Sequence, residues 1–532
     1  MRVSFSPGMH RAWRALTGQL LAAGLLLAAG CSTVPFDVPR PHSQALAQPL
    51  ETTLGRAFAS RLAATPGQSG FRLLSTGQDA FIARAALADG AERSLDLQYH
   101  IVSRDATGTM LLLRALQAAQ RGVRLRLLID DLDTGGRDPD FAAMATHPNV
   151  QVRVFNPFSR RFTSGLARAI DYLGDGARLN RRMHNKLWIA DNAAALIGGR
   201  NLGDAYFSAD GQGNFADLDV LAAGPVVQEA SRSFDAFWNS EWAVPIEAFT
   251  GPAHNARPLA QLLAEMEASA RAFRDSAYAQ ALRSTDLGPL VRNGQVALTA
   301  AAATLLYDPP AKLHAVTPTP TDSVVARLRG ATDATRSELL IVSPYFVPSE
   351  TGITLMCALQ RRGAQVRVLT NSLASTDVVA VHAGYARYRA RLLACGIALH
   401  ELRPSVVGPG SVRRVLSSVV SLHGKAIVFD RRSALIGSMN LDPRSRLSNT
   451  EIGVLIASTV LAQQLGDWFD EAAAPERAFR VALSEPGNPA SALVWTGHED
   501  GQPVRLTSEP LARWWQHLAA ALLGLLVPED ML

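Results

Sequence analysis

A short pattern of a histidine, a lysine two residues later and an aspartate five residues after that occurs twice in this 532-residue chain. The two copies are His184, Lys186 and Asp191, and His423, Lys425 and Asp430. The chain holds 12 histidines, 47 acidic residues and only three lysines among its 52 basic residues. From that composition about 0.006 matches are expected by chance, so two copies indicate a shared chemical role.

This combination of imidazole and ammonium groups suits phosphodiester chemistry. A neutral imidazole can attack phosphorus, a protonated one can give its proton to the departing oxygen, and lysines neutralise the phosphate oxygens. An asparagine follows each histidine by 17 residues, Asn201 in GGRN and Asn440 in GSMN, where small neighbours let donors approach a phosphate. Ser438 adds a hydroxyl in the second copy, where the first has Gly199. The cysteine and histidine spacings match no metal site, so neither a metal nor another cofactor is predicted.

Each motif runs into an apolar, strand-like segment, LWIA after the first and AIVF after the second. Side chains two residues apart on a strand share a face, so each histidine and its lysine point to the same side. Asp191 and Asp430, seven residues after the histidines, fall on the other face or past the strand end. They complete the predicted catalytic motif, but we expect them to anchor the strand rather than to touch a substrate.

The segments around the motifs repeat as well, with an offset close to 240 residues. The matching pairs are 94–130 with 337–371, 184–201 with 423–440, and 215–224 with 449–458. The first pair follows the order strand, loop, amphipathic helix, glycine turn and strand. The sequence therefore predicts an α/β fold made of two duplicated halves, each a mixed β-sheet flanked by helices.

Composition sets the expected boundaries of these parts. They are a signal peptide at 1–30, a tether and extension at 31–75, a first half at 76–250, a helical connector at 251–320, a second half at 321–480 and a C-terminal extension at 481–532. Within the last part, 512–527 combines Trp514 and Trp515 with a long apolar run. That run predicts either a helix in the membrane interface or a helix that packs on the core, and both remain open. Lys312, before the second half, is either a headgroup contact or an ordinary linker lysine.

The first 30 residues contain three arginines, no acid and a short apolar run, as a secretory signal does. The run ends in Ala-Ala-Gly before Cys31, which resembles a bacterial lipobox and would make Cys31 a lipidated first residue; an uncleaved signal anchor is the alternative. Without this segment 49 basic residues face 47 acidic ones, so the formal charge of +5 does not indicate a nucleic-acid-binding surface. Cys357 and Cys395 lie in apolar helical runs and are expected to be buried thiols.

The paired motifs, each followed by a glycine-rich turn and an asparagine, resemble those of the phospholipase D superfamily over roughly residues 80–480. The resemblance implies that the two halves meet to form one active site at their interface. It also implies that one histidine becomes a phosphohistidine while the other acts first as general acid and then as general base. The resemblance favours His184 as the nucleophile and His423 as the acid, but the symmetry of the motifs leaves that order open.

The same resemblance implies that an acid after each motif orients its histidine. Matching the two halves position by position assigns this role to Asp217 and Glu451, with Asp219 as an alternative to Asp217.

Within the superfamily, the lipidated start, the length, and the segments FNPF, HNK and GGRN are similar to the bacterial cardiolipin synthase C group. That similarity implies an enzyme that transfers a phosphatidyl group, with phosphatidylethanolamine as the expected donor and phosphatidylglycerol as the acceptor, to make cardiolipin. The alternatives are a phospholipid hydrolase, a nuclease of the same superfamily and a lipid-binding lipoprotein without activity. We expect phospholipids and the membrane surface as partners, no nucleic acid, and a periplasmic body attached to the cell envelope. The sequence does not reveal an activating protein, the oligomeric state, or which membrane carries the anchor.

Overall fold

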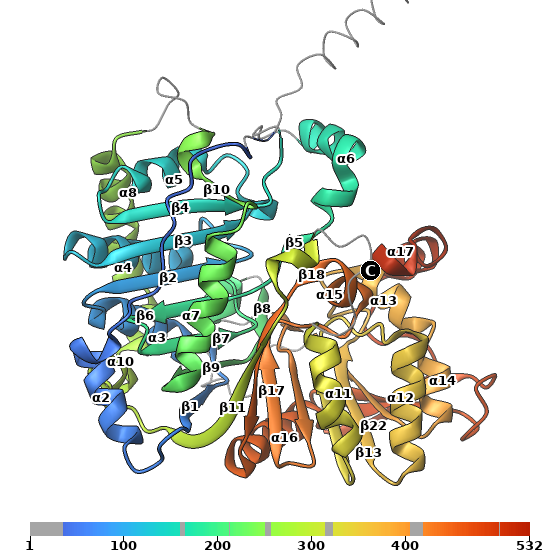
Figure 1. The fold of residues 1–532 in the computed structure, drawn as a ribbon. Coiled ribbons are helices and arrows are strands. Elements are labelled where there is room, and N and C mark those ends of the chain that lie inside the picture. The colour runs from blue at the N-terminus through green and yellow to red at the C-terminus, as the bar shows by residue number, and fades with distance from the viewer. Residues whose placement is uncertain are drawn as a thin grey trace, which may run out of the picture.

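The computed structural model describes residues 34, 36–159, 165–211, 213–249, 257–313, 323–404, 419–499 and 501–531. The expected signal peptide and Cys31 lie outside these residues. Two α/β halves lie side by side, each with a mixed sheet covered by helices (Figure 1), so the prediction of a duplicated α/β fold is confirmed.

The sheet of the first half contains eight strands of its own. In order of pairing they are β10 (Ala243–Pro245), β4 (Val150–Phe155), β3 (Arg124–Asp130), β2 (Ser94–Tyr99), β6 (Leu187–Ala190), β7 (Ala194–Gly198), β9 (Asp219–Ala223) and β1 (Ser69–Leu74). Strands β2, β3 and β4 are parallel, and the other pairs are antiparallel. Strand β1 lies in the range expected to be an extension, so the first half begins earlier than the composition suggested.

The second half repeats this order of strands. Its strands are β14 (Ala398–Leu402), β13 (Gln365–Asn371), β12 (Glu338–Val342), β16 (Ala426–Phe429), β17 (Ser433–Gly437) and β19 (Ile452–Ala457). Strands β20 (Ala478–Leu483), β21 (Leu493–Glu499) and β22 (Gln502–Leu506) continue the sheet beyond β14 in antiparallel fashion. The second sheet therefore extends into the range expected to be a C-terminal extension.

One strand belongs to both sheets. Strand β11 (Thr299–Tyr307) pairs with β1 through residues 299–301 and with β19 through residues 302–307. The connector expected to be helical does contain helices, α8 (Leu259–Arg274), α9 (Ala277–Leu282) and α10 (Leu287–Arg292), which precede this strand. Because β11 is shared, the connector is part of the fold of both halves rather than a spacer.

Helices cover both faces of each sheet. Helices α3 (Gly77–Gly90) and α4 (Ala106–Gln120) lie on the outer face of the first sheet, and α12 (Ser349–Arg361) and α14 (Arg389–Ala394) lie on that of the second. Helices α7 (Pro225–Trp238) and α16 (Thr459–Ala472) pack where the halves meet. Several of these helices begin at a side-chain cap, such as Thr76 before α3, Asp105 before α4 and Ser458 before α16.

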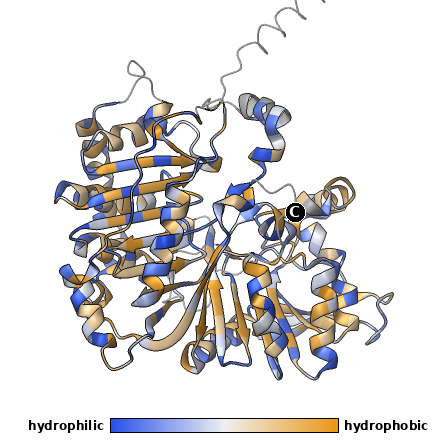
Figure 2. Cartoon of the chain, in the orientation of Figure 1, coloured by the Kyte–Doolittle hydropathy of each residue, from blue (hydrophilic) through white to orange (hydrophobic). Residues whose placement is uncertain are grey.

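A single apolar core is shared by the two halves. It joins Ile189 and Val220 of the first sheet to Val428 and Val454 of the second, together with Phe234 of α7. The apolar strands in the middle of both sheets stand out in Figure 2. Because burial of apolar surface stabilises this contact, the interface between the halves is fixed rather than hinged.

The segment expected to be a free tether is held against the first half. The backbone N–H of Ser43 donates to Asn239 (3.1 Å) and that of Ala45 donates to Asp235 (2.8 Å), both at the end of α7. Phe36 meets the ring of Trp242 edge-on, with 5.6 Å between ring centroids. Residues 36–48 therefore form a strap, a name we keep below, and α2 (Thr53–Leu62) follows it.

The expectation of two buried thiols is wrong, because Cys357 of α12 and Cys395 after α14 form a disulfide. Their Cα atoms are 5.5 Å apart, and 38 residues separate them in the sequence. The two helical turns are adjacent on the outer face of the second sheet, a proximity that the sequence spacing alone does not reveal.

The last α-helix of the described chain, α17 (Trp514–Leu526), packs against α13 (Val379–Ala386). Among the described residues, no helix combines the length and apolar character needed to cross a membrane.

Candidate active site

Two short parallel strand pairs cross between the halves and set the position of both histidines. Strand β5 (Arg182–Met183) pairs with β18 (Asn449–Thr450), and β8 (Gly213–Ala216) pairs with β15 (Val419–Leu422). The backbone N–H of His184, just after β5, donates to the carbonyl of Thr450 (2.9 Å). The N–H of His423, just after β15, donates to the carbonyl of Ala216 (2.8 Å).

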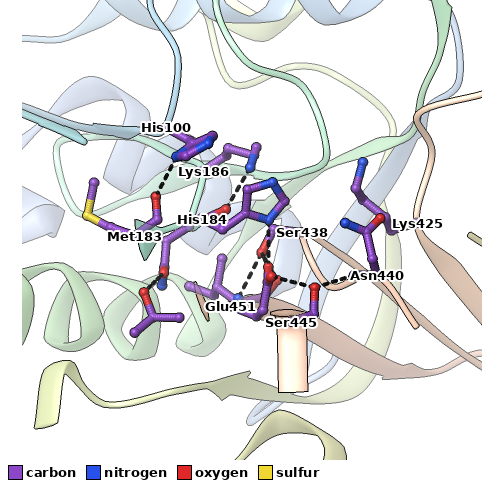
Figure 3. Close-up of polar contacts among 12 residues, drawn as sticks. His100, Met183, His184, Lys186, Lys425, Ser438, Asn440, Ser445 and Glu451 are labelled. Atoms are coloured by element: carbon purple, nitrogen blue, oxygen red, sulfur yellow. Dashed lines mark hydrogen bonds and ion pairs between the residues drawn. The ribbon is translucent and has the colours of Figure 1, made fainter. Parts of the chain in front are cut away.

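The pairings bring each histidine beside a carboxylate of the other half. Nδ1 of His184 lies 2.9 Å from Oε2 of Glu451 (Figure 3), and Nδ1 of His423 lies 2.6 Å from Oδ2 of Asp217. The expectation that each acid orients the histidine of its own half is therefore wrong. The acids are the ones expected, but their partners are exchanged. With Nδ1 engaged, Nε2 of each ring is the nitrogen left to face a substrate.

The two carboxylates are supported differently. A Cβ atom at Gly199 would lie 2.2 Å from Oδ1 of Asp217, so the first half needs glycine there to make room for the acid. At the equivalent place Ser438 donates its hydroxyl to Glu451 (2.5 Å), and Ser445 donates to the other oxygen of Glu451 (2.8 Å). Ser438, expected either to bind phosphate or to orient another group, thus orients Glu451.

Asp219, the alternative to Asp217, lies away from both histidines in the ion pairs of the first half. Its carboxylate is 2.9 Å from Arg84 and 3.4 Å from Arg200, and all three side chains are buried.

Both motif lysines are buried beside their histidines. Lys186 donates to the carbonyl of His184 (2.7 Å), and Lys425 donates to that of His423. Nζ of Lys425 is also 3.0 Å from Nδ1 of His423. Burial lowers the pKa of Lys186 to about 7 and that of Lys425 to about 8. A bound phosphate would therefore stabilise the charged form of both lysines.

Charge is distributed unequally over the two histidine–carboxylate pairs. Burial, followed by Lys186 and Lys425, holds the pKa of His184 well below its usual range, and burial raises the pKa of Glu451. Burial acts to raise the pKa of Asp217 too, but His423 and nearby cations outweigh it and lower that pKa. The charged Asp217 in turn offsets part of the lowering that burial and Lys425 impose on the pKa of His423.

The third lysine belongs to the support of Glu451 and makes no contact of the kind expected of a headgroup ligand. Lys312 is buried and donates to Asp308 (2.8 Å) and to the carbonyl of Ser445 (2.8 Å). The same oxygen of Asp308 accepts the backbone N–H of Glu451 (3.0 Å). All three lysines of the chain therefore lie in or directly behind the site.

Asp191 and Asp430 lie away from the reacting groups, so they are positioning residues and not catalytic ones. Asp191 accepts the backbone N–H groups of residues 92–94 at 2.8–2.9 Å. Asp430 accepts those of residues 336–338 at 2.7–3.1 Å. Each acid fixes the start of the neighbouring strand, β2 or β12, as the strand alternation predicted.

The side-chain amides of the two asparagines differ in the hydrogen bonds that they make within the protein. The amide of Asn201 accepts from the N–H of Ile101 (3.1 Å) and donates to the hydroxyl of Tyr206 (3.0 Å). The buried Oδ1 of Asn440, beside Lys425 in Figure 3, has no hydrogen-bond partner among the described residues. Oδ1 can accept a hydrogen bond from a substrate hydroxyl, whereas only Nδ2 of Asn440 can donate to a phosphate oxygen.

Several neighbours of the histidines were not predicted by any sequence pattern. The ring of His100, just after β2, meets His184 edge-on at 5.0 Å between centroids, and its Nδ1 is 3.1 Å from the carbonyl of Met183. The ring of Tyr206 lies 5.1 Å from that of His423. Within the described part of the chain, no group of three or more histidines, cysteines or acids is placed to hold a metal ion.

Comparison with known proteins agrees with this geometry. The family model described as "Cardiolipin synthase, PLD-like domain" matches residues 85–238 and 328–473, one motif in each match. The chain belongs to this family of phospholipase D-like proteins. "Cardiolipin synthase C" of Escherichia coli is 36% identical over 479 residues, covering 88% of this chain and 97% of that protein. A "Cardiolipin synthase" of Geobacillus kaustophilus is 24% identical over 427 residues, covering 78% of this chain and 70% of that one.

Among solved structures, phosphatidylserine synthase from Haemophilus influenzae superposes with a TM-score of 0.56 at 13% identity, covering 90% of this chain and all of that one. That likeness shows a shared fold. Together with the family match, it confirms the resemblance to the phospholipase D superfamily drawn from the motifs.

The structural role of Asp191 in this family member can be tested. Asp191→Ala leaves three backbone N–H groups without their acceptor, so we expect the free energy of unfolding to fall by about 2–4 kcal/mol in urea denaturation. The exposed acid Glu267 in α8, changed to alanine, provides the control and should have little effect. Loss of activity with an unchanged free energy of unfolding would instead show that Asp191 takes part in catalysis.

Proposed function

We propose that the protein makes cardiolipin by transferring a phosphatidyl group from a donor phospholipid, expected to be phosphatidylethanolamine, to phosphatidylglycerol. The observation that carries the proposal is the pair of histidines, each held by a carboxylate of the opposite half, with two lysines beside them. The name and 36% identity of the Escherichia coli relative support the choice of product.

In the first step, Nε2 of His184 attacks the phosphorus of the donor and the bond from phosphorus to the headgroup oxygen breaks. His423 gives its proton to that oxygen, so the headgroup leaves with a neutral hydroxyl and the phosphatidyl group remains on His184. Lys186, Lys425 and Asn440 stabilise the charge on the phosphate oxygens.

In the second step, His423 takes the proton of a glycerol hydroxyl of phosphatidylglycerol, and the resulting oxygen attacks phosphorus. The bond from phosphorus to His184 breaks, which releases cardiolipin and restores both histidines. If water enters in place of the lipid hydroxyl, the product is phosphatidic acid and the enzyme is a hydrolase.

The unequal support of the two pairs favours His184 as the nucleophile. Burial holds the pKa of His184 low, which favours a neutral imidazole. Its Nδ1–H donates to the carboxylate of Glu451, which two serine hydroxyls also support, so Nε2 carries no proton and can attack. Asp217 stays charged and lies only 2.6 Å from His423, which favours a protonated ring. The order that the family resemblance implied for His184 and His423 is thus supported by their surroundings.

We further propose a periplasmic, membrane-attached enzyme, anchored through a lipid on Cys31. The Cys357–Cys395 disulfide supports this location, since such bonds persist in oxidising compartments such as the bacterial periplasm. The nearly balanced charge of the chain without its first 30 residues argues against a nucleic acid partner.

The lipid product decides between the candidate activities. Mixed vesicles of phosphatidylglycerol and phosphatidylethanolamine should yield cardiolipin with the native protein, and His184→Ala or His423→Ala should lower the rate about 10³-fold or more. His498→Asn, at a half-buried histidine of β21 that is paired with Glu476, is the matched control and should retain activity. Phosphatidic acid as the only product would support hydrolysis, and cleavage of DNA without lipid turnover would support a nuclease.

The assignment of nucleophile and acid has its own test with a p-nitrophenyl ester of phosphatidic acid, whose acidic leaving group needs no proton. His423→Asn should still release a burst of p-nitrophenol as His184 is phosphatidylated, whereas His184→Asn should release none. The reverse pattern would exchange the two roles.

The lysines predict the alkaline side of the pH profile. Lys186 and Lys425 are charged below their pKa values of about 7 and about 8 and neutral above them. We therefore expect kcat/KM, which reports groups of the free enzyme, to fall as the pH rises through this range. Lys186→Arg should abolish the decrease in kcat/KM near the lower of these two pKa values, because a guanidinium stays charged. A profile that stays flat to about pH 9 would contradict this role for the lysines.

Anchoring is tested by Cys31→Ser. The native protein should incorporate labelled fatty acid and stay in the membrane fraction after an alkaline wash, whereas the variant should lose both properties. Ser32→Ala, next to the cysteine, is the control. Unlabelled native protein would point to an uncleaved signal anchor, and a variant that stays in the membrane fraction would point to such an anchor or to the C-terminal segment.

A further inference from the structure

Helix α17 leaves one apolar face uncovered. Of the fourteen large apolar side chains that the described chain leaves exposed, eight lie between residues 511 and 531. On the helix itself the exposed fractions include 77% for Trp514, 53% for Leu518, 50% for Leu522 and 85% for Leu525. Their spacing of three or four residues gathers them on one side of the helix.

The opposite face of α17 is firmly held, so the exposure does not come from a detached tail. The buried amide of Gln516 donates to the carbonyl of Leu373 (2.9 Å), and Arg387 donates to that of Gly524. Beyond the helix, the hydroxyl of Tyr388 donates to Glu529 (2.5 Å). The interpretation of this segment as a packing helix is therefore confirmed for one face, and the other face is left exposed.

The segment that follows α17 packs on an element that supports the active site. The short helix that follows α17, η6 (Glu529–Met531), packs against α15 (Pro443–Leu447). Helix α15 carries Ser445, which holds the carboxylate of Glu451. A surface that binds α17 therefore lies on the side of the molecule that carries α15, the helix that helps to hold Glu451.

We propose that α17 is a membrane-docking helix whose apolar face enters the interface of a phospholipid bilayer. Residues 514–526 carry no charged side chain, and exposed Arg513 and Arg387 flank the two ends of the helix, where they match anionic headgroups. Thirteen residues span about 20 Å, which is too short to cross a bilayer and suits a helix lying in its surface. Exposed tryptophans at one end are typical of that location.

The strap also favours a bilayer as the partner of α17, an argument that rests on the proposed lipid anchor at Cys31. Five residues separate Cys31 from Phe36, whose ring is fixed against Trp242, and five residues reach at most about 18 Å. A lipid on Cys31 therefore keeps the body close to a bilayer, which is a surface that the exposed apolar helix fits.

Tryptophan fluorescence provides the test, because the other tryptophans among the described residues are buried and only Trp514 and Trp515 are exposed. Full-length protein with Trp13→Phe in every arm, since Trp13 lies outside the described residues, is added to vesicles of phosphatidylglycerol and phosphatidylethanolamine whose acyl chains carry bromine. We expect quenching of the native protein, and loss of that quenching when Trp514 and Trp515 are both changed to phenylalanine. Unquenched native protein would overturn the proposal.

A second variant keeps the tryptophans and removes the apolar face. Leu518→Gln, Leu522→Gln and Leu525→Gln together should weaken binding to the same vesicles by about 100-fold or more, measured with Cys31→Ser in both arms. Leu50→Gln with Val460→Gln, two similarly exposed apolar positions elsewhere, should bind as before. Circular dichroism and the melting temperature show whether each variant is folded.

Two outcomes would contradict the proposal. One is vesicle binding unchanged in the triple variant, and the other is a triple variant whose sedimentation shows a lost dimer, since α17 would then serve a second copy of the chain. The result is independent of the proposed activity, because absence of cardiolipin from every variant would refute the transferase while leaving the quenching readout valid.

Discussion

The exchange of carboxylates between the halves is the constraint on which the rest of the structure depends. His184 is held by Glu451 and His423 by Asp217, so neither half contains a complete histidine–carboxylate pair. The crossed strand pairs, the shared apolar core and the common strand β11 all serve to keep these contacts in register. A small rotation of one half would break both pairs at once, which is why a rigid interface matters for catalysis here.

The pairs have the same topology but different chemistry. A glycine beside Asp217 leaves that acid close to His423, while two serines, Asp308 and Lys312 build a larger hydrogen-bonded support around Glu451. The difference places a charged acid behind one histidine and an acid of raised pKa behind the other. Two similar motifs can therefore hold different protonation states in one site.

The sequence predicted what is local and missed what is distant. Strand alternation correctly separated His184 and Lys186 from Asp191, because faces of a strand follow from spacing alone. The exchange of acids depends on a register between residues 267 positions apart, which no local pattern encodes. The same holds for the Cys357–Cys395 disulfide and for His100 beside His184. Strand β11 was missed because its alanine-rich sequence continues a run of helices.

The pairing of β1 with β11 shows how such a molecule is related to a symmetric assembly. These strands occupy the same place in the two sheets. Leu74 of β1 and Leu306 of β11 are equivalent by their register with β9 and β19, so Ser69 and Ala301, each five residues earlier, are equivalent too. Ser69 and Ala301 face each other, so a local two-fold axis passes between them, as in an isologous dimer. Two identical subunits would have to carry the same residues on both sides of that axis. A single chain has no such obligation, and its two sides are free to become a proton donor and a nucleophile.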